Sequence, residues 1–486
     1  MKDAVVAELE FVGRALLAVL GALLPSWLVG GSMPNSHGGS RWARANEHRL
    51  LGRKSAPERA WGDGIAIGFL GRRLLQTPAE DNLLVLGVQR SGKTSTVVIP
   101  TLLNWKGAAV ATSTKQELVR ICARRRTDLG PVWVFSPLDR DQSWIEEIGL
   151  LPAAWNPISS IVDCGNAAEL ADHFTAHGKF GSSPHWYLAA SNLITALAVV
   201  EHERGGDMAT LLARLNRTAI AEYAQLAAVT EDQTAADLLA GFARTPDVEA
   251  GSIASTARTC LGLWLDPRIS AATSTSASQL NLDQLLAEAG TLFLVAPAEE
   301  AERCRPLFSA LIGSLLRQAT ARARDLGGVV APRLLLALDE AANFTRIPRL
   351  AGYASSGPGQ GIQLLLSFHD LAQIESGYGR DQARTIWNNC RARLLLPGQG
   401  DLQTLEQFSR AIGDETRVYR STHSDQWRSS SSEQRVGRPL MSPDDLRRLR
   451  EAVLLYANAP PALIRPRRWD EVNHFRRLAQ GALPAS

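Results

Sequence analysis

Short, uninterrupted runs of apolar residues recur along most of the chain. Runs of this length without polar alternation are typical of strands that are buried on both faces of a parallel sheet. Segments with helical potential separate many of these runs, which gives an alternating order of strand and helix. We therefore expect an α/β fold with a doubly wound, mostly parallel sheet, whose strands lie at 82–86, 108–111, 132–135, 291–295, 333–338, 362–368, 392–396 and 452–456.

One long segment interrupts this alternation, because 165–285 has the pattern of helices throughout. Stretches such as HWYLAASNLITALAVVEHE and GSIASTARTCLGLWL carry no strand signal. The simplest layout is an all-α domain that is inserted into the α/β domain. The expected organisation is a hydrophobic N-terminal segment (1–35), a basic and polar linker (36–63), the two parts of the α/β domain (64–164 and 286–470), the inserted all-α domain (165–285) and a C-terminal tail (471–486).

The N-terminal segment contains an uncharged apolar run at 15–30, ALLAVLGALLPSWLVG. A membrane-spanning helix needs about 20 apolar residues, and extension of the run back over 11–13 includes Arg14. Trp27 lies where an interfacial aromatic residue would, and arginines follow the run, which predicts that the rest of the chain stays in the cytoplasm. We expect a short hydrophobic helix that acts as a single membrane anchor. A helix docked on the soluble part and a secretory signal are the alternatives.

The composition narrows the class of protein. The chain has 486 residues, of which 45% are hydrophobic and 21% charged, so it is neither disordered nor fully embedded in a membrane. With 52 basic and 49 acidic residues, the net charge of +3 does not by itself argue for nucleic acid or membrane binding. The five cysteines are scattered singly, which is typical of buried thiols in a reducing compartment and not of a disulfide or zinc framework.

A phosphate-binding loop follows the first predicted strand. The sequence GVQRSGKT fits the pattern GxxxxGK[ST] between a strand and a helix, which is the context that this motif requires. The glycines allow a tight turn, so that backbone N–H groups point at the β-phosphate. The lysine would supply charge near the β- and γ-phosphates, and the threonine hydroxyl would bind Mg²⁺. We expect ATP binding by Gly87, Val88, Gln89, Arg90, Ser91, Gly92, Lys93, Thr94 and Ser95.

A pair of acids ends the predicted strand at 333–338. Such a loop needs a second acid, from a neighbouring strand, to hold hydrated Mg²⁺, and Asp339 is in the position to do so. Glu340 follows it and would polarise the attacking water. The pair therefore predicts ATP hydrolysis with Thr94 and Asp339 as the Mg²⁺ ligands, although apolar runs that end in Asp-Glu also occur where a strand simply meets a solvated loop.

Together, these segments resemble the coupling ATPases of type IV secretion and bacterial conjugation, the TraG/TraD-like, TraM-recognition group. The resemblance runs from about 64 to 469 and includes GVQRSGKTS, ATSTKQEL, PVWVFSPLD, LDEAANFTRIPRL, GIQLLLSFHDLAQI, YGRDQARTIWNNCRARLLL and LLYANAPPALIR. It implies a RecA-like P-loop ATPase that forms a homo-hexamer on the cytoplasmic face of the bacterial inner membrane. The implied partners are DNA, expected to be single-stranded, relaxase or secreted-protein substrates, and type IV secretion channel components. A single-pass membrane protein and a soluble cytoplasmic form are both consistent with this.

Two positions depart from the family pattern. The family has a glycine-arginine pair and a further basic residue before the strand at 362–368, and its arginine is thought to reach the neighbouring subunit's ATP. Here 355–361 reads SSGPGQG and has no cation. Arg391 or Arg393 could substitute, or could be ordinary surface arginines. The family also has glutamine as a γ-phosphate sensor where this chain has His369, which can donate to a phosphate but is sensitive to pH.

Two basic segments leave alternatives open. Residues 124–126, three arginines, could contact DNA phosphates, but cations at the end of a helix are favoured by its dipole alone. The polar, serine-rich segment 414–439 could form a hairpin that touches DNA, but a mobile loop is favoured.

Three functions remain open at this stage. The first is an ATP-driven coupling protein or DNA translocase of a type IV secretion system, with Glu340 and His369 as catalytic residues. The second is a nucleotide-binding substrate receptor with little or no hydrolysis, which the missing loop arginine favours. The third is a DNA motor of the chromosome-segregation type.

Overall fold

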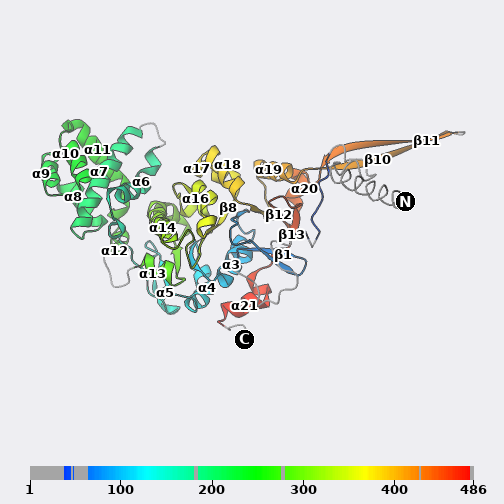
Figure 1. Ribbon diagram of the computed structural model, residues 1–486, viewed down its shortest axis with the longest axis horizontal. Coiled ribbons are helices and arrows are strands. Elements are labelled where there is room, and N and C mark those ends of the chain that lie inside the picture. Colours follow the sequence, from blue (N-terminus) through cyan, green and yellow to red (C-terminus); the bar gives the residue numbers. More distant parts are fainter. Residues whose placement is uncertain are drawn as a thin grey trace, which may run out of the picture. The chain divides into compact units, whose positions relative to one another are not determined.

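The computed structural model describes residues 38–44, 47–48, 64–179, 184–274, 280–425 and 428–481 (Figure 1). The chain divides into two compact units. We call them the hairpin unit, Met1–Arg41 with Glu406–Pro443, and the sheet unit, Trp42–Leu405 with Asp444–Ser486. The apolar run at 15–30 lies outside the described residues, so the anchor stays a prediction. Among the helices that are described, none is long and apolar enough to cross a membrane.

The sheet unit is built on a nine-stranded sheet, and this confirms the predicted mostly parallel α/β fold. Every predicted strand is present, and the central ones are buried along their whole length. Two antiparallel strands extend one edge. In sheet order the strands are β13 (Ala462–Ile464), β12 (Ala452–Tyr456), β9 (Ala392–Leu395), β3 (Leu83–Leu86), β8 (Ile362–Phe368), β7 (Leu334–Leu338), β4 (Ala108–Ser113), β6 (Thr291–Val295) and β5 (Val132–Phe135). A separate two-stranded sheet pairs β1 (Ala66–Leu70) with β2 (Arg73–Gln76).

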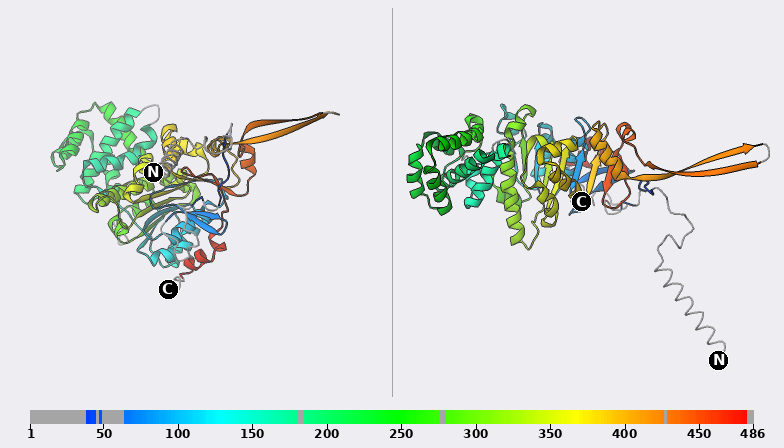
Figure 2. Two further views of the ribbon diagram at one scale, coloured as in Figure 1. Left: turned by 45° about the vertical axis from the view of Figure 1, so that its right-hand side comes forward. Right: turned by 90° about the horizontal axis from the view of Figure 1, so that it is seen from above.

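The connections between the strands explain where a ligand can bind. From β3 the chain passes through β4 to β5, and from β6 it returns through β7 and β8 to β9. Because such crossovers are right-handed, the two directions place helices on opposite faces, and Figure 2 shows helices on both sides of the sheet. β3 and β8 are neighbours whose connections leave in opposite directions. Their carboxyl ends therefore form the switch point at which α/β sheets bind ligands.

The helices between and after these strands are short, with one exception of 28 residues. They are α3 (Ile99–Asn104), α4 (Glu117–Thr127), α5 (Ser143–Glu147), α14 (Ala298–Asp325), α15 (Ala341–Phe344), α16 (Leu350–Ser356), α17 (Leu371–Tyr378), α18 (Arg380–Asn389), α20 (Pro443–Arg448) and α21 (Asn473–Ala479).

The segment between β5 and β6 contains no strand in its described part. The helices α6 to α11 cluster together in Figure 1, whereas α13 contacts α14 and β4. The longest, α7, packs against α6, α8, α10 and α11 and buries Leu193, Ile194 and Leu197. These helices are α6 (Cys164–Lys179), α7 (Pro184–Glu203), α8 (Met208–Arg217), α9 (Tyr223–Ala228), α10 (Gln233–Ala243), α11 (Asp247–Cys260), α12 (Pro267–Ala272) and α13 (Leu282–Ala287).

Helix α14 contacts both this helical segment and the core of the sheet unit. The Phe308 ring stacks on Phe344 of α15, with centroids 5.8 Å apart and planes at 14°. Further along α14, Arg317 donates to Glu169 of α6 at 2.7 Å. Both contacts come after Pro306, the proline inside this helix, so one uninterrupted stretch of α14 makes them.

Arg126 is a structural residue, which excludes DNA contact, the less favoured alternative for 124–126, at this position. Its side chain is fully buried. The guanidinium donates to the carbonyl oxygens of Trp105, Gly107 (2.6 Å) and Ala289 (3.2 Å), and to the Thr291 hydroxyl (2.6 Å). Burial of a charged group is tolerated when its donors are satisfied in this way. Arg126 therefore joins the loops that lead into β4 and β6.

The hairpin unit contains two long strands where a mobile loop was favoured. β10 (Asp414–Asp425) and β11 (Arg428–Pro439) form a continuous antiparallel ladder. The helix α19 (Leu402–Ile412) precedes them. Gly39 forms a bridge to Glu415 at the base of β10. The favoured prediction of a mobile loop was wrong, because the ladder supplies the backbone hydrogen bonds that the polar side chains gave no reason to expect.

Candidate functional site

The phosphate loop connects β3 to a π-helical turn, η3 (Thr94–Val98), which continues into α3. Gly92 has a φ of +93°, a conformation that favours glycine. A Cβ atom on Gly87 would lie 2.5 Å from the Ser91 hydroxyl oxygen, so this close approach also requires glycine. Both glycines of the motif are therefore needed for the shape of the loop. Arg90, between them, also has a positive φ, of 65°.

Lys93 folds back over the loop that precedes it. Its Nζ donates to the Gly87 carbonyl oxygen at 2.5 Å and to that of Val88 at 3.1 Å. The side chain is buried, which lowers the pKa of its amine, while the negative charges of Asp339 and Glu340 raise it. The lysine charge thus lies beside the loop and close to both predicted acids.

Thr94 and Asp339 meet at the carboxyl ends of β3 and β7. The Thr94 hydroxyl donates to Asp339 Oδ2. Ser367, near the end of β8, donates to Asp339 Oδ1 at 3.2 Å, and Thr112 of β4 donates to the Asp339 carbonyl oxygen at 2.7 Å. Burial raises the pKa of the Asp339 carboxyl, and the Thr94 hydrogen bond opposes that rise. Strand order thus brings together two residues that are far apart in the sequence.

This oxygen pair fits Mg²⁺. A hydroxyl and a buried carboxylate in contact are hard ligands of the kind that Mg²⁺ prefers. In the described part of the chain, no three His, Cys, Asp or Glu side chains gather to hold a metal. Mg²⁺ does not need such a cluster, because it usually takes one or two protein ligands together with phosphates and water.

Glu340 begins α15 in a left-handed conformation, with a φ of +50°. A non-glycine residue with this φ is uncommon, and such residues gather at functional sites. Its N–H donates to Asp339 Oδ1 at 3.2 Å, and Asn343 Nδ2 lies 3.4 Å from Glu340 Oε2. The carboxylate is half-buried and is held by Asn343 beside the buried acid.

His369 follows β8 and lies near the same groups. Its backbone is held on both sides, since its N–H donates to Gln373 Oε1 at 2.9 Å and its carbonyl accepts from Gln399 Nε2 at 2.7 Å. The ring Nε2 is buried and has no hydrogen-bond partner. Burial lowers the pKa of the imidazole, and the nearby charge of Lys93 lowers it further. A buried polar atom without a partner is the kind that a ligand can satisfy.

Two contributors were missed by the sequence reasoning. Ser367 and Asn343 hold Asp339 and Glu340, respectively. The signal for Ser367 was its polar side chain near the end of a largely apolar strand. Asn343 is one helical turn after Glu340, on the same face of α15.

The candidate substitutes for the loop arginine have other partners. Arg391 pairs with Asp81 at 3.0 Å, and Tyr456 donates to the other oxygen of Asp81 at 2.7 Å. The guanidinium of Arg393 lies 5.1 Å from the ring centre of Trp387. Arg391 directly precedes β9, and Arg393 is in the half of β9 that pairs with the start of β3, whereas the phosphate loop follows the end of β3. Neither is therefore beside the phosphate loop of its own chain.

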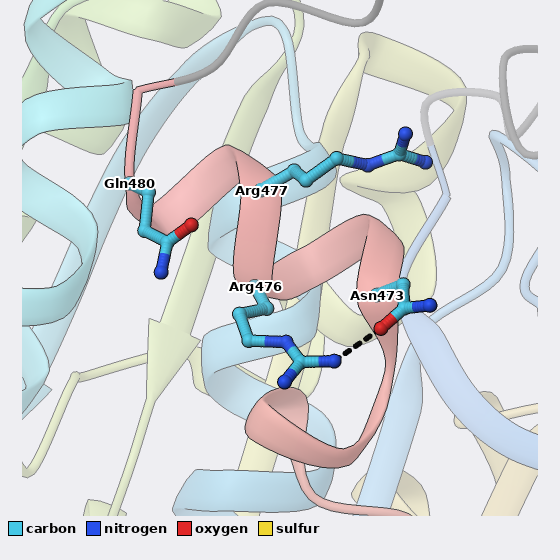
Figure 3. A pocket seen from close by; sticks show the side chains of 4 residues that line it. All are labelled: Asn473, Arg476, Arg477 and Gln480. Carbon is cyan, nitrogen blue, oxygen red and sulfur yellow. Dashed lines mark hydrogen bonds between the residues drawn. The ribbon is translucent and has the colours of Figure 1, made fainter.

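A shallow pocket of about 460 Å³ on α21 lies outside this site (Figure 3). It is lined by Asn473, Arg476, Arg477 and Gln480. Arg476 is held by the Asn473 side chain within the same helix. None of these residues belongs to the phosphate loop or to the acid pair.

Comparison with known proteins shows which family the chain matches. The family described as "Type IV secretory system Conjugative DNA transfer" matches residues 41–476. The conjugal transfer protein TraG of Escherichia coli is 26% identical over 468 residues, which cover 85% of this chain and 71% of TraG. VirD4 of Rhizobium rhizogenes is 26% identical over 475 residues, covering 92% of this chain and 68% of VirD4.

Solved structures of the plasmid coupling protein TrwB share the fold. TrwB in complex with a non-hydrolysable ATP analogue has a TM-score of 0.66 at 18% identity, and the alignment covers 90% of this chain and 96% of TrwB. TrwB in complex with ADP and Mg²⁺ has a TM-score of 0.62.

Proposed function

The chain belongs to the type IV secretory system conjugative DNA transfer family, and we propose that it is a coupling protein that hydrolyses ATP to drive DNA or protein substrates into a secretion channel. The observation that carries this proposal is the contact of Thr94 with Asp339 beside the buried Lys93. Two motifs from distant parts of the sequence thereby form one site of the kind that a magnesium–nucleotide complex requires.

The phosphate loop has the features for nucleotide binding. The amides of 87–95 and the start of η3 would surround the β-phosphate. Lys93 would exchange its carbonyl partners, Gly87 and Val88, for phosphate oxygens. Thr94 and Asp339 would hold Mg²⁺, which neutralises charge that develops on the phosphates when bound. The complex of TrwB with ADP and Mg²⁺ supports this assignment.

Glu340 and His369 would act at the γ-phosphate. Glu340 would orient a water molecule and accept its proton as the water oxygen bonds to the γ-phosphorus and the bond to the β–γ bridging oxygen breaks. Asn343 would keep the carboxylate in position. The unpartnered ring of His369 would contact the γ-phosphate and so distinguish ATP from ADP.

The proposal extends to the oligomeric state, the cellular location and the partners of the chain. We expect a homo-hexamer that is attached to the bacterial inner membrane through 15–30, with the bulk of the chain in the cytoplasm. Its partners would be DNA, expected to be single-stranded, relaxase or secreted proteins, and channel components. The family match and the TrwB fold support this setting.

A second candidate is a nucleotide-binding receptor with little hydrolysis. The segment 355–361 has no cation, and Arg391 is paired with Asp81 before the start of β9 and β3, at the strand ends opposite the phosphate loop. Since an arginine from a neighbouring subunit can supply about 10³–10⁵ in rate, a chain without one could bind ATP and turn it over very slowly.

ATP turnover of the full chain with and without DNA separates the two candidates. A coupling ATPase is expected to turn over faster when single-stranded DNA is added, and this gain should disappear in Glu340→Gln. A basal rate that neither DNA nor Glu340→Gln changes would favour the receptor. Double-stranded DNA in a parallel assay tests for a motor of the chromosome-segregation type.

Contact of His369 with the γ-phosphate predicts pH-dependent binding of ATP but not of ADP. Burial holds the imidazole pKa below its usual value, so the ring is neutral at neutral pH. A nearby phosphate favours the protonated ring, so ATP binding should raise this pKa and take up a proton. Each unit of that rise strengthens ATP binding by up to about tenfold as the pH is lowered from neutral to below the pKa of the free ring.

Calorimetric titration of ATP and ADP over this range measures the effect. The pH dependence that ATP binding shows beyond that of ADP binding should be lost in His369→Gln. It should be kept in His185→Gln, because the His185 side chain is exposed. Equal pH dependence in the wild type and in His369→Gln would show that His369 does not sense the phosphate.

A further inference from the structure

The hairpin β10–β11 is unusually long for a sheet of only two strands. Each strand has 12 residues, and the register runs without a break from Asp414↔Pro439 to Asp425↔Arg428. A two-stranded hairpin that stands alone is marginally stable in water. We therefore expect a partner that stabilises the hairpin, either by covering a face of it or by adding a strand to it.

The hairpin does not bury a face of its own. Among its residues with described side chains, 414–420 and 433–439, none is buried. Val418, Tyr419 and Val436 are exposed to 48%, 50% and 36%. In the described chain β10 and β11 pair only with each other, apart from the bridge between Gly39 and Glu415. Unpaired edges of this kind are templates for the addition of another strand.

The charges on the two strands complement each other. β10 carries Glu415 and Arg420, and their register partners on β11 are Arg438 and Glu433. Each of these cross-strand pairs combines opposite charges, which stabilises a sheet, whereas like charges that face each other destabilise it. A β10 strand of another copy that paired with β11 in the same register would again bring Arg420 opposite Glu433. The charges of β11 would therefore complement those of β10 of another copy.

The strand directions suit such an addition. β10 and β11 are antiparallel, so rotation of a second copy about an axis along the hairpin places its β10 beside this β11, again antiparallel. Repetition around the axis closes a ring of strands that leaves no edge unpaired, as in up-and-down barrels.

We propose that β11 of one copy pairs with β10 of the neighbouring copy, so that the hairpins of the assembled protein form a continuous antiparallel collar. The partner is a second copy of this chain, recognised through backbone hydrogen bonds and the alternating charges. The inference relies on the proposed ring only for the presence of neighbouring copies. It is tested by association and not by ATP turnover, so the two proposals can fail separately.

Disulfide trapping between two populations of the full chain tests the collar. One population carries Val418→Cys on β10 and the other carries Arg435→Cys on β11, at register partners on the same face. Both also carry Cys164→Ser and Cys260→Ser, because these two cysteines are partly exposed and could form disulfides of their own. The other three cysteines are buried and stay in place. Under mild oxidation we expect linked dimers in the mixture and not in either population alone.

The matched control replaces Val418→Cys with Tyr419→Cys, which points to the other face of the ladder. Linked dimers should then be scarce. No linked dimer in the first mixture, or equal linking in the control, would overturn the proposed pairing. A chain that stays monomeric in mass photometry would overturn it too.

A shortened hairpin gives an independent measurement. An Asn-Gly turn that joins Glu415 directly to Arg438 keeps the base of the hairpin and removes the ladder above it. The association constant of the full chain should fall about tenfold or more, because many ladder hydrogen bonds and charge pairs are lost. Unchanged association would overturn the collar, and unchanged association with weaker DNA binding would assign the hairpin to DNA instead.

Discussion

Replacement of Glu340 by glutamine is expected to lower the rate of ATP turnover by about 10²–10⁴-fold, the contribution typical of a general base. Glutamine has the size of glutamate and can still accept the hydrogen bond from Asn343, but it cannot take a proton from water. ATP binding should change little, because Lys93, Thr94 and Asp339 stay in place. Single-turnover hydrolysis, measured beside equilibrium binding of ATP, separates the two effects.

Glu299→Gln is the matched control for this variant. Glu299 is an exposed acid in the first turn of α14, so its replacement should leave turnover unchanged. If Glu340→Gln hydrolysed ATP at the rate of the control, Glu340 would not be the base, and the acid pair would serve the metal alone.

Replacement of Lys93 by alanine is expected to weaken ATP binding by about 30-fold or more, since loss of a buried charge contact typically costs about 2–5 kcal/mol. Lys93 is buried and already directed at the loop carbonyls, where phosphate would replace its partners. Its loss leaves the phosphate charge without its compact cation. Binding of a fluorescent ATP analogue, together with the rise in melting temperature on addition of ATP, measures the effect.

Lys115→Ala is the matched control, because Lys115 is an exposed lysine that follows β4. It should bind ATP like the wild type. Lys93→Arg is informative as well, since a planar guanidinium does not fit where a compact ammonium does. If Lys93→Ala bound ATP normally, the proposed position of the phosphates would be wrong.

Much of the sheet could be predicted, because its strands are buried on both faces and burial leaves continuous apolar runs such as 362–368. The strands β10 and β11 left no such trace, since they are polar and bury neither face. Strand signals in a sequence report burial and not backbone pairing. The role of Arg126 was left open for a related reason, because the sequence shows that a helix ends in arginines but not which of them points inward.

The candidate site could likewise be predicted only in part. The phosphate loop is a local motif whose shape depends on Gly87 and Gly92, so the sequence alone predicted it. The contact between Thr94 and Asp339 could be expected from the motif pair, but its geometry depends on the order of β3, β8 and β7. Ser367 was missed because its role follows from which strands are neighbours, and one sequence does not contain that information.

Helix α14 connects the acid pair to the helical segment mechanically. Its Phe308 ring lies against Phe344, four residues after Glu340, and its Arg317 is tied to α6. An uninterrupted α-helix is stiff along its axis, so these two contacts cannot shift independently. A movement that starts at Glu340 would therefore be transmitted through α14 to α6, and a load on α6 would act back on Phe344.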